Sequence, residues 1–241
     1  MDVVYHAICT INPGNSNQKY MIGYSRDFTQ TIKLCEILEK TGAKLIFLSS
    51  GGTVYGNALK MPITEETIPH PINHYGNLKL CIENTLLTFA YQERLRVVIA
   101  RISNPYGPGQ DYRKGVGVID AALQCSINGT TMEVWGNGSV VRDYIYIDDV
   151  CNMLISLAQN NSINDYIYNV SSGRGTSVNE IVGIVRSING KLEVNYKEAR
   201  KVDAQEIVLS NTKIKEIYHY DLMEIEAGIK AFYEYLVRNV C

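Results

Sequence analysis

The fold is decided by the stretch 48–56, which reads LSSGGTVYG and follows an apolar run at 44–48. Together they predict a buried strand with hydroxyl groups at its carboxyl end. About two dozen residues later, YGNLK at 75–79 places Tyr75 and Lys79 on one face of a helix. Ligands of open parallel sheets bind outside the carboxyl ends of the strands, where both features would converge. The pair indicates proton transfer, because a nearby ammonium stabilises a phenolate.

Apolar runs alternate with helical patterns along the chain, which is typical of a parallel α/β sheet. We expect Ser25 and Asp148 to cap helices and Gly42 to end one. Ser177 and Glu180 form a capping box for a helix that ends near Gly190. The expected strands are 2–8, 44–48, 97–102, 132–135 and 165–170, and the other expected helices are 25–40, 75–93, 116–128, 149–159 and 223–237.

Composition excludes several classes of protein. The chain has 241 residues, of which 46% are hydrophobic, enough for one substantial core. A net charge of −2 provides no basic stripe for nucleic acid and no membrane anchor. No apolar run reaches the length of a membrane span, and the six cysteines and four histidines lack metal-ligand spacing. We expect reduced, buried cysteines, no metal, no nucleic-acid or membrane partner, and a cytoplasmic location.

The order of the motifs resembles one family. After LSSGGTVYG and YGNLK come RISNPYGP at 101–108, GNG at 136–138 and RDYI at 142–145. This series resembles the extended short-chain dehydrogenase/reductases of the NAD-dependent epimerase/dehydratase family, in particular the UDP-glucose 4-epimerase type, over nearly all of the chain. The resemblance implies a Rossmann-like, doubly wound parallel sheet with NAD as cofactor and a UDP-sugar as substrate. The implied reaction is transient oxidation at sugar C4 with non-stereospecific hydride return, in polysaccharide or sugar-nucleotide metabolism.

The family's first strand and glycine-rich turn have no counterpart here. Residues 2–8 resemble the family's fourth strand, so we expect a partial Rossmann-like sheet that lacks the first three strands. The outer edge of residues 2–8 would then be unpaired, and we expect the sequence to be a fragment of a longer product. Residues 1–103 would be the C-terminal part of the NAD-binding domain. Residues 104–241 would mainly be a smaller α+β substrate domain, with the strand 165–170 returning to the sheet.

The resemblance assigns the catalytic residues. Tyr75 would be the base and acid, and Lys79 would tune it and hold the nicotinamide ribose. The family's catalytic hydroxyl aligns with Gly51, so Ser50 or Thr53 must replace it, and strand alternation favours Thr53. The alternative is that both hydroxyls only satisfy backbone groups. The chain has Gly52 and Thr53 where 4,6-dehydratases carry Asp-Glu, which argues against that reaction.

Further contacts are implied by the same resemblance. The family's diphosphate-binding arginines align with Arg142 and Arg200, whose forked guanidinium groups match phosphate oxygens. Asn104 would bind the nucleotide sugar and Trp135 would pack on the uracil. The alternatives are surface charges, an Asn-Pro turn and a core tryptophan. The further residues expected at the cofactor are Ala7, Ser49 and Ser103.

Several questions stay open. Ile207 aligns with the position that gates the sugar C2 substituent, and its intermediate size does not decide between plain and N-acetylated sugars. Thr10 and Asp27 depart from family residues that hold NAD. The alternative functions are a catalytically inactive remnant or UDP-sugar-binding subunit, and a UDP-glucuronate epimerase or decarboxylase. A homodimer through the helices 26–41 and 75–93 is also expected.

Overall fold

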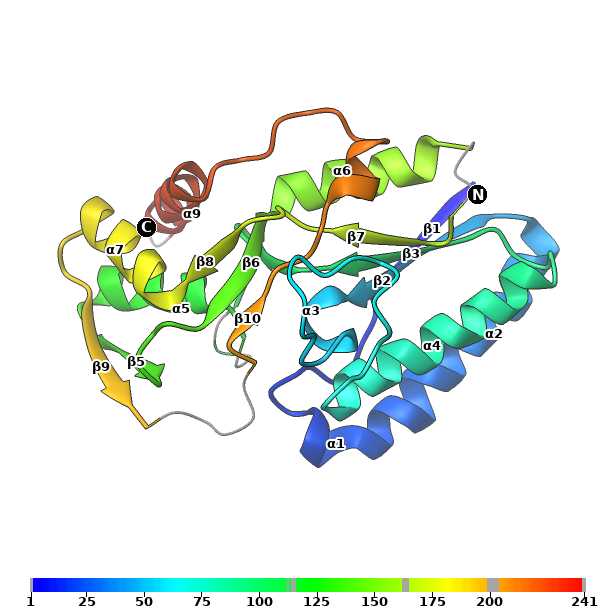
Figure 1. The fold of residues 1–241 in the computed structure, drawn as a ribbon, viewed down its shortest axis with the longest axis horizontal. Helices are drawn as coiled ribbons and strands as arrows, with labels where there is room; N and C mark the ends of the chain where they lie inside the picture. Colours follow the sequence, from blue (N-terminus) through cyan, green and yellow to red (C-terminus); the bar gives the residue numbers. More distant parts are fainter. Residues whose placement is uncertain (1, 112, 114–115, 162–164, 199–203, 240–241) are drawn as a thin grey trace.

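A four-stranded parallel sheet forms the centre of the structure. The computed structural model describes residues 2–111, 113, 116–161, 165–198 and 204–239. The sheet has the order β1-β2-β3-β7, and Figure 1 shows it between layers of helices. Its strands are β1 (Val3–His6), β2 (Lys44–Ser50), β3 (Val97–Ile102) and β7 (Ile167–Val170). This arrangement confirms the predicted α/β fold, and β7 returns to the sheet after a long excursion of the chain.

The register of the strands creates the ligand edge. Ser50 at the end of β2 lies beside Ile102 at the end of β3, and Ile102 lies beside Val170 of β7. Three neighbouring strands therefore stop at the same level, which is where parallel sheets bind ligands. In the part of the chain that the structure describes, β1 pairs with β2 alone, so its other side is an open sheet edge.

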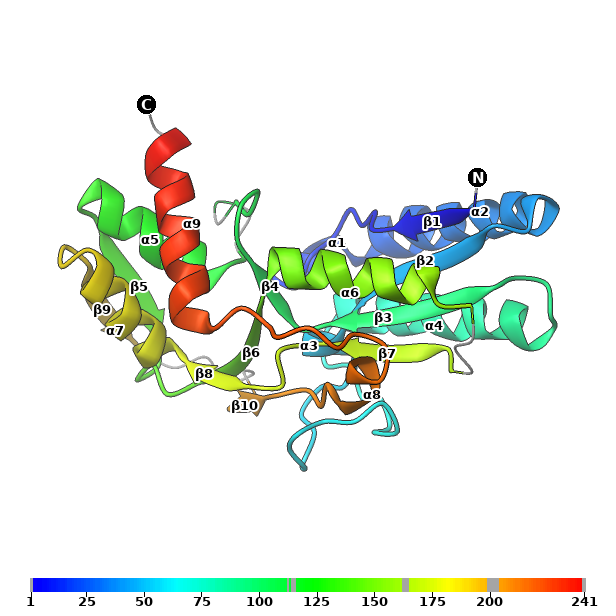
Figure 2. The same cartoon turned by 90° about the horizontal axis from the view of Figure 1, so that it is seen from above.

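Helices cover both faces of this sheet. On one face, α2 (Thr29–Thr41) and α4 (His74–Tyr91) bury apolar side chains against β2 and β3. On the other face, α6 (Ile147–Gln159) packs through Val150, Met153 and Leu157; Figure 2 shows the arrangement from above. Gly42 ends α2 with φ +67°, as predicted, because a left-handed cap favours glycine.

A second group of strands and helices extends from the ligand edge. Its central strand is β6 (Val141–Tyr146), which is joined to β4 (Asn104–Tyr106), β10 (Glu206–Ile207) and β8 (Gly175–Ser177). A separate pair consists of β5 (Thr131–Trp135) and β9 (Glu193–Lys197). The helices α5 (Val118–Asn128), α7 (Val178–Ile188) and α9 (Ile225–Asn239) share one apolar core with these strands. The capping box of Ser177 and Glu180 is present at α7, as predicted.

Some local predictions are wrong. Ser25 caps no helix: it lies inside a π-helical turn, η1 (Gly23–Phe28), and its hydroxyl donates to the Met21 carbonyl. The helix α1 (Ser16–Ile22) before it was not expected. The N-cap of α6 is Tyr146, so Asp148 lies within the first turn.

Two further helices among the described residues are short. The helices are α3 (Gly51–Val54) and α8 (Thr212–Lys215). Among the described cysteines, which are all free thiols, Cys35 is buried but Cys151 is exposed. Cys9, Cys81 and Cys125 are partly buried, so the expected burial holds fully for Cys35 and fails for Cys151. No helix in the described ranges is long and apolar enough to cross a membrane.

Candidate functional site

A cavity of about 500 Å³ opens at the carboxyl ends of β2 and β3. It lies where the central sheet meets the β4–β6 group, so both parts of the chain contribute to its wall. Among the predicted site residues, the cavity is lined by Ser50, Thr53, Tyr75, Ser103, Asn104 and Arg142. The fold therefore gathers, in one place, side chains that are scattered over most of the sequence.

The start of α4 brings Tyr75 to the cavity. The side chain of Asn73 caps the helix by accepting a hydrogen bond of 2.8 Å from the Gly76 amide. A Cβ atom at Gly76 would lie 2.5 Å from the Thr53 carbonyl oxygen, so only glycine permits this approach of α4 to α3. Burial raises the pKa of Tyr75, and a hydrogen bond with Ser50 acts in the opposite direction by favouring the phenolate.

Lys79 lies one turn along α4 from Tyr75 and is only 3% exposed. Its Nζ donates to the Leu48 carbonyl at 2.8 Å and lies 5.7 Å from the centre of the Tyr75 ring. Burial lowers the pKa of Lys79, while Cys9, Asp27 and Glu83 act to raise it. The structure thus brings the Lys79 ammonium group close to the Tyr75 ring at the end of β2.

The two candidate hydroxyls differ in their surroundings. Thr53 Oγ1 is buried and has no hydrogen-bond partner among the described residues, so it satisfies no backbone group. Ser50 instead acts on Tyr75, whose pKa it lowers. At Gly51, a Cβ atom would lie 2.3 Å from a side-chain methyl of Leu209, which fills the space beside that glycine. A replacement for the hydroxyl missing at Gly51 must therefore come from Ser50 or Thr53, which flank it.

The β4–β6 pair supplies the polar wall opposite Tyr75. Asn104 Nδ2 donates to the Asp143 carbonyl at 3.0 Å, and an Arg142 Nη donates to the Val141 carbonyl at 2.8 Å. Arg142 and Tyr144 both line the cavity. Arg200, the second predicted phosphate ligand, lies outside the described residues.

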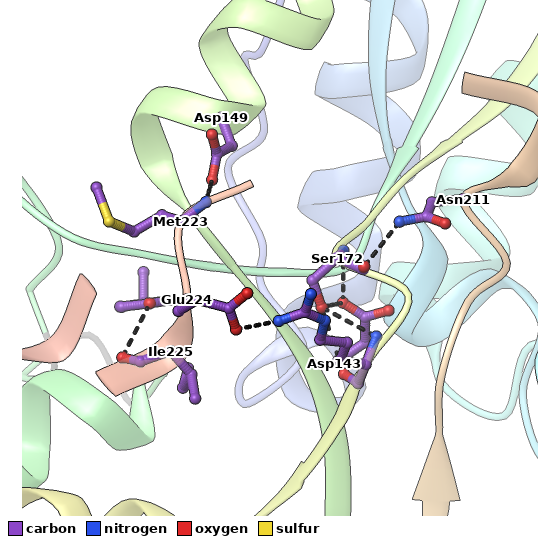
Figure 3. A network of polar contacts seen from close by, with 9 residues as sticks. Asp143, Asp149, Ser172, Asn211, Met223, Glu224 and Ile225 are labelled. Atoms are coloured by element: carbon purple, nitrogen blue, oxygen red, sulfur yellow. Dashed lines mark hydrogen bonds and ion pairs between the residues drawn. The ribbon is translucent and has the colours of Figure 1, made fainter. Parts of the chain in front are cut away.

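Asp143 of β6 lies in a network of polar contacts, and Figure 3 shows its hydrogen bonds with Ser172. Its fully buried carboxylate accepts hydrogen bonds from the backbone and hydroxyl of Ser172 and from the amides of Gly173 and Leu209. Burial raises the pKa of Asp143 to about 6, against the effect of these donors. One side chain thereby ties β6 to the segment after β7 and to Leu209, beside the cavity.

Other predicted residues lie less directly at the cavity. Ser49 is 5% exposed, and its hydroxyl donates to Glu83. Ala7 is exposed just after β1. Trp135 is 46% exposed at the end of β5 and is not among the described lining residues. Ile207 lines the cavity and is 6% exposed.

One residue at the cavity was missed by sequence reasoning. Gln110 donates to the Pro105 carbonyl at 2.9 Å, while its Oε1 is buried without a partner in the described chain. Gly117, at φ +98°, leaves room for this amide, because a Cβ atom there would lie 2.7 Å from Gln110 Cδ. No sequence signal marks Gln110, since its position depends on contacts across the 107–117 loop.

The donor set fits the nicotinamide-ribose end of NAD. The ammonium of Lys79 carries three N–H donors and makes one described hydrogen bond, to Leu48. Thr53 Oγ1 nearby is a buried polar atom that lacks a partner among the described residues. Within the described chain, no group of three or more His, Cys, Asp and Glu side chains could hold a metal ion.

Comparison with known proteins gives a consistent result. A putative UDP-glucose 4-epimerase of Methanocaldococcus jannaschii is 28% identical over 242 residues, covering 99% of this chain and 78% of that protein. The crystal structure of the Thermotoga maritima UDP-glucose 4-epimerase with UDP-glucose matches with a TM-score of 0.93 and 32% identity, covering 100% of this chain and 78% of that one.

A second solved structure and the family match point the same way. The Thermus thermophilus UDP-glucose 4-epimerase in complex with NAD matches with a TM-score of 0.87 and 26% identity, over 98% of this chain and 77% of that one. The model of one protein family matches residues 1–171, which are most of the chain. The chain therefore belongs to the NAD dependent epimerase/dehydratase family.

Proposed function

We propose that the protein is an NAD-dependent UDP-sugar 4-epimerase, an isomerase that inverts the configuration at sugar C4. The observation that carries this proposal is a cavity lined by Tyr75, by Thr53 with its unpartnered hydroxyl and by Arg142, with the buried ammonium group of Lys79 close to the Tyr75 ring. Residues 1–103 would supply the proton-transfer groups, and residues 104–241 would supply most of the nucleotide-binding wall.

Tyr75 would accept the proton of the sugar 4-hydroxyl and later return it. Lys79 makes this feasible because its ammonium stabilises the phenolate, which a buried phenol otherwise disfavours. Thr53 would hydrogen-bond the 4-oxygen and orient it toward Tyr75. Bound NAD supplies the hydride acceptor and donor for C4, and Lys79 and Tyr75 would hold its nicotinamide ribose.

Arg142 and Asn104 would bind the nucleotide half of the substrate. The guanidinium fork of Arg142 suits diphosphate oxygens. Among the described lining residues, Arg142 is the one charged side chain.

The direct test is turnover of UDP-galactose by the purified protein with added NAD. Appearance of UDP-glucose, followed by chromatography or NMR, supports the proposal. Binding of UDP-galactose with no conversion would favour a UDP-sugar-binding subunit. That alternative is consistent with Gly51, which lacks the family's catalytic hydroxyl. Faster conversion of UDP-glucuronate than of UDP-galactose would transfer the assignment to the uronate class.

Replacing Arg142 by Ala tests the nucleotide-binding assignment. We expect UDP binding to weaken by about 1.5–3 kcal/mol, the range for a hydrogen bond to a charged group, measured by isothermal titration calorimetry. Arg174→Ala is the matched control, because Arg174 is 64% exposed and pairs with Glu224 instead. Equal UDP affinity in wild type and Arg142→Ala would remove Arg142 from the site.

We further propose a homodimer and a cytoplasmic location. The helical regions 26–41 and 75–93 carry Ile37, 56% exposed on α2, and Tyr91, 69% exposed on α4. A second copy could cover such apolar groups. Light scattering should give a dimer that Ile37→Glu weakens, and a monomer at every concentration would exclude it. The free thiols of the described cysteines suit a reducing compartment.

A further inference from the structure

The helix α4 contacts the end of β2 through three residues spaced four apart. Tyr75 lies beside Ser50, which acts to lower the pKa of Tyr75, and Lys79 donates to the Leu48 carbonyl at 2.8 Å. One turn further, Glu83 accepts a hydrogen bond from Ser49. Three successive turns of the helix therefore hold three consecutive residues of the strand, and only the last of these turns has no part in the proposed chemistry.

Glu83 is fully buried and bound to Arg101 of β3. The two side chains are 1% and 3% exposed, and Arg101 Nη2 lies 2.6 Å from Glu83 Oε2. Arg101 Nε adds contacts of 3.2 Å to both carboxylate oxygens. The pair thus links α4, β2 and β3 directly beneath the catalytic residues.

Arg101 extends the connection toward β7. Its guanidinium carbon lies 4.7 Å from the centre of the Tyr55 ring, and the Tyr55 hydroxyl donates to Asn169 at 2.8 Å. None of these side chains lines the cavity, so none is placed to touch the substrate. They contact one another instead, and Arg101 Nη1 is left without a hydrogen-bond partner among the described residues.

We propose that Glu83 and Arg101 are positioning residues that fix the register of α4 on β2, and thereby the placement of Tyr75 and Lys79. This inference rests on the proposed function. A buried ion pair is a poor device for stability alone, because well-packed apolar side chains often serve as well or better. Glu83 also accepts a hydrogen bond from Ser49, so the pair links α4, β2 and β3. This link explains why a polar pair is used at this position.

The charge of Glu83 also acts on Lys79. Glu83 lies one turn from Lys79 and acts to raise its pKa, against the effect of burial. Asp27 and Cys9 face the same ammonium from η1 and from the segment after β1 and act in the same direction, whereas His6 of β1 is its neutral neighbour. Neutralising Glu83 therefore lowers the pH at which Lys79 loses its proton.

The first experiment needs neither NAD nor turnover. The titration of Lys79 is followed by NMR of ¹³C-labelled lysine in the whole protein, with the signal assigned by its loss in Lys79→Met. In Glu83→Gln we expect the deprotonated fraction of Lys79, at a pH near the wild-type midpoint, to rise measurably. Glu39→Gln is the matched control, because it neutralises the more exposed ion pair with Arg94 and should leave Lys79 unchanged. An identical Lys79 titration in wild type and Glu83→Gln overturns the electrostatic part.

The second experiment separates positioning from stability. The double variant Glu83→Gln/Arg101→Met lacks both charges and leaves neither one buried without a partner. Its Tm should therefore be close to that of wild type. We expect kcat on UDP-galactose to stay at least tenfold low, while KM and UDP affinity change less than twofold. Wild-type kcat in this stable double variant would show that the pair is only structural and would overturn the proposal. If the double variant does not fold, Ser49→Ala, which removes a single contact to Glu83, should still lower kcat severalfold, and unchanged kcat there counts against it. If wild type itself has no epimerase activity, the proposed function fails, while the Lys79 titration still tests the effect of Glu83 on Lys79.

Discussion

Thr53→Val should make the free protein more stable and the enzyme slower. Valine has the shape of threonine without the hydroxyl, so the packing of α3 is kept. The hydroxyl oxygen removed is buried and lacks a hydrogen-bond partner among the described residues. Leaving such a group unsatisfied costs about 1–3 kcal/mol, so its removal should raise the free energy of unfolding by about 1 kcal/mol or more. For a chain of this size that corresponds to roughly 2–4 °C in Tm per kcal/mol.

The same change should lower kcat by about 10²-fold, a typical contribution of one aligned proton-transfer or oxyanion partner. The assay pairs calorimetric unfolding, with and without UDP-galactose, with kcat measured at saturating substrate and NAD. Bound sugar should stabilise wild type more than Thr53→Val, because only the wild type gains a partner for its hydroxyl. The stability difference between the two proteins should therefore shrink or reverse when UDP-galactose is present.

Ser50→Ala is the comparison that decides between the two hydroxyls. Ser50 acts to lower the pKa of Tyr75, so its loss should move the pH dependence of kcat toward higher pH. We expect a smaller loss of kcat at the optimum than in Thr53→Val. A Thr53→Val protein that is less stable than wild type, or that turns over at the normal rate while Ser50→Ala is nearly inactive, would refute this reasoning and transfer the role to Ser50.

Three further outcomes follow from the structure. Tyr75→Phe should abolish epimerisation while UDP-sugar affinity by calorimetry stays nearly unchanged, and full activity would overturn the mechanism. Gly76→Ala should lower the free energy of unfolding by about 1–3 kcal/mol, because its Cβ would lie 2.5 Å from the Thr53 carbonyl; an unaffected Tm would contradict this. Burial, aided by Lys79, lowers the pKa of His6, so the unfolded chain binds more protons below about pH 6.5. The free energy of unfolding should then fall as pH drops through that value, and less steeply in His6→Gln. Plots of this free energy against pH that run parallel for wild type and His6→Gln would exclude the effect.

Most of the central sheet and the Tyr75–Lys79 pair were predictable, because period and spacing are local properties of the sequence. Gly42 and the Ser177–Glu180 box were equally local signals. The region 16–28 was not predictable in this way. Its apolar residues Tyr20, Met21 and Ile22 are 40–63% exposed, so the hydrophobic pattern there does not mark a buried face. The short strands β4 and β10 exist through their pairing with β6, which no local pattern encodes.

The candidate site was predictable in its residue types but not in its contacts. Resemblance identified Gly51 as a position without its hydroxyl, yet only the fold shows that Leu209, distant in sequence, fills the adjoining space. Ser49 was expected at the cofactor from its position at a strand end. In the structure its hydroxyl donates to Glu83, whose carboxylate is also paired with Arg101. Such placements depend on tertiary contacts between elements, which spacing within one element cannot reveal.

The distribution of unsatisfied polar atoms makes the strongest physical case for a ligand. Folded proteins pair nearly all of their buried polar groups, so an unpaired one calls for an explanation. Five side-chain atoms of this kind lie among the described residues: Thr53 Oγ1, Ser103 Oγ and Gln110 Oε1 belong to residues that line the cavity, whereas Ser16 Oγ and Arg101 Nη1 do not. Hydroxyl groups and an amide oxygen in one cavity suit a ligand rich in hydroxyl groups, as a nucleotide sugar is. The stability that these atoms forgo in the free protein would be recovered when the substrate binds, and this difference is what Thr53→Val measures.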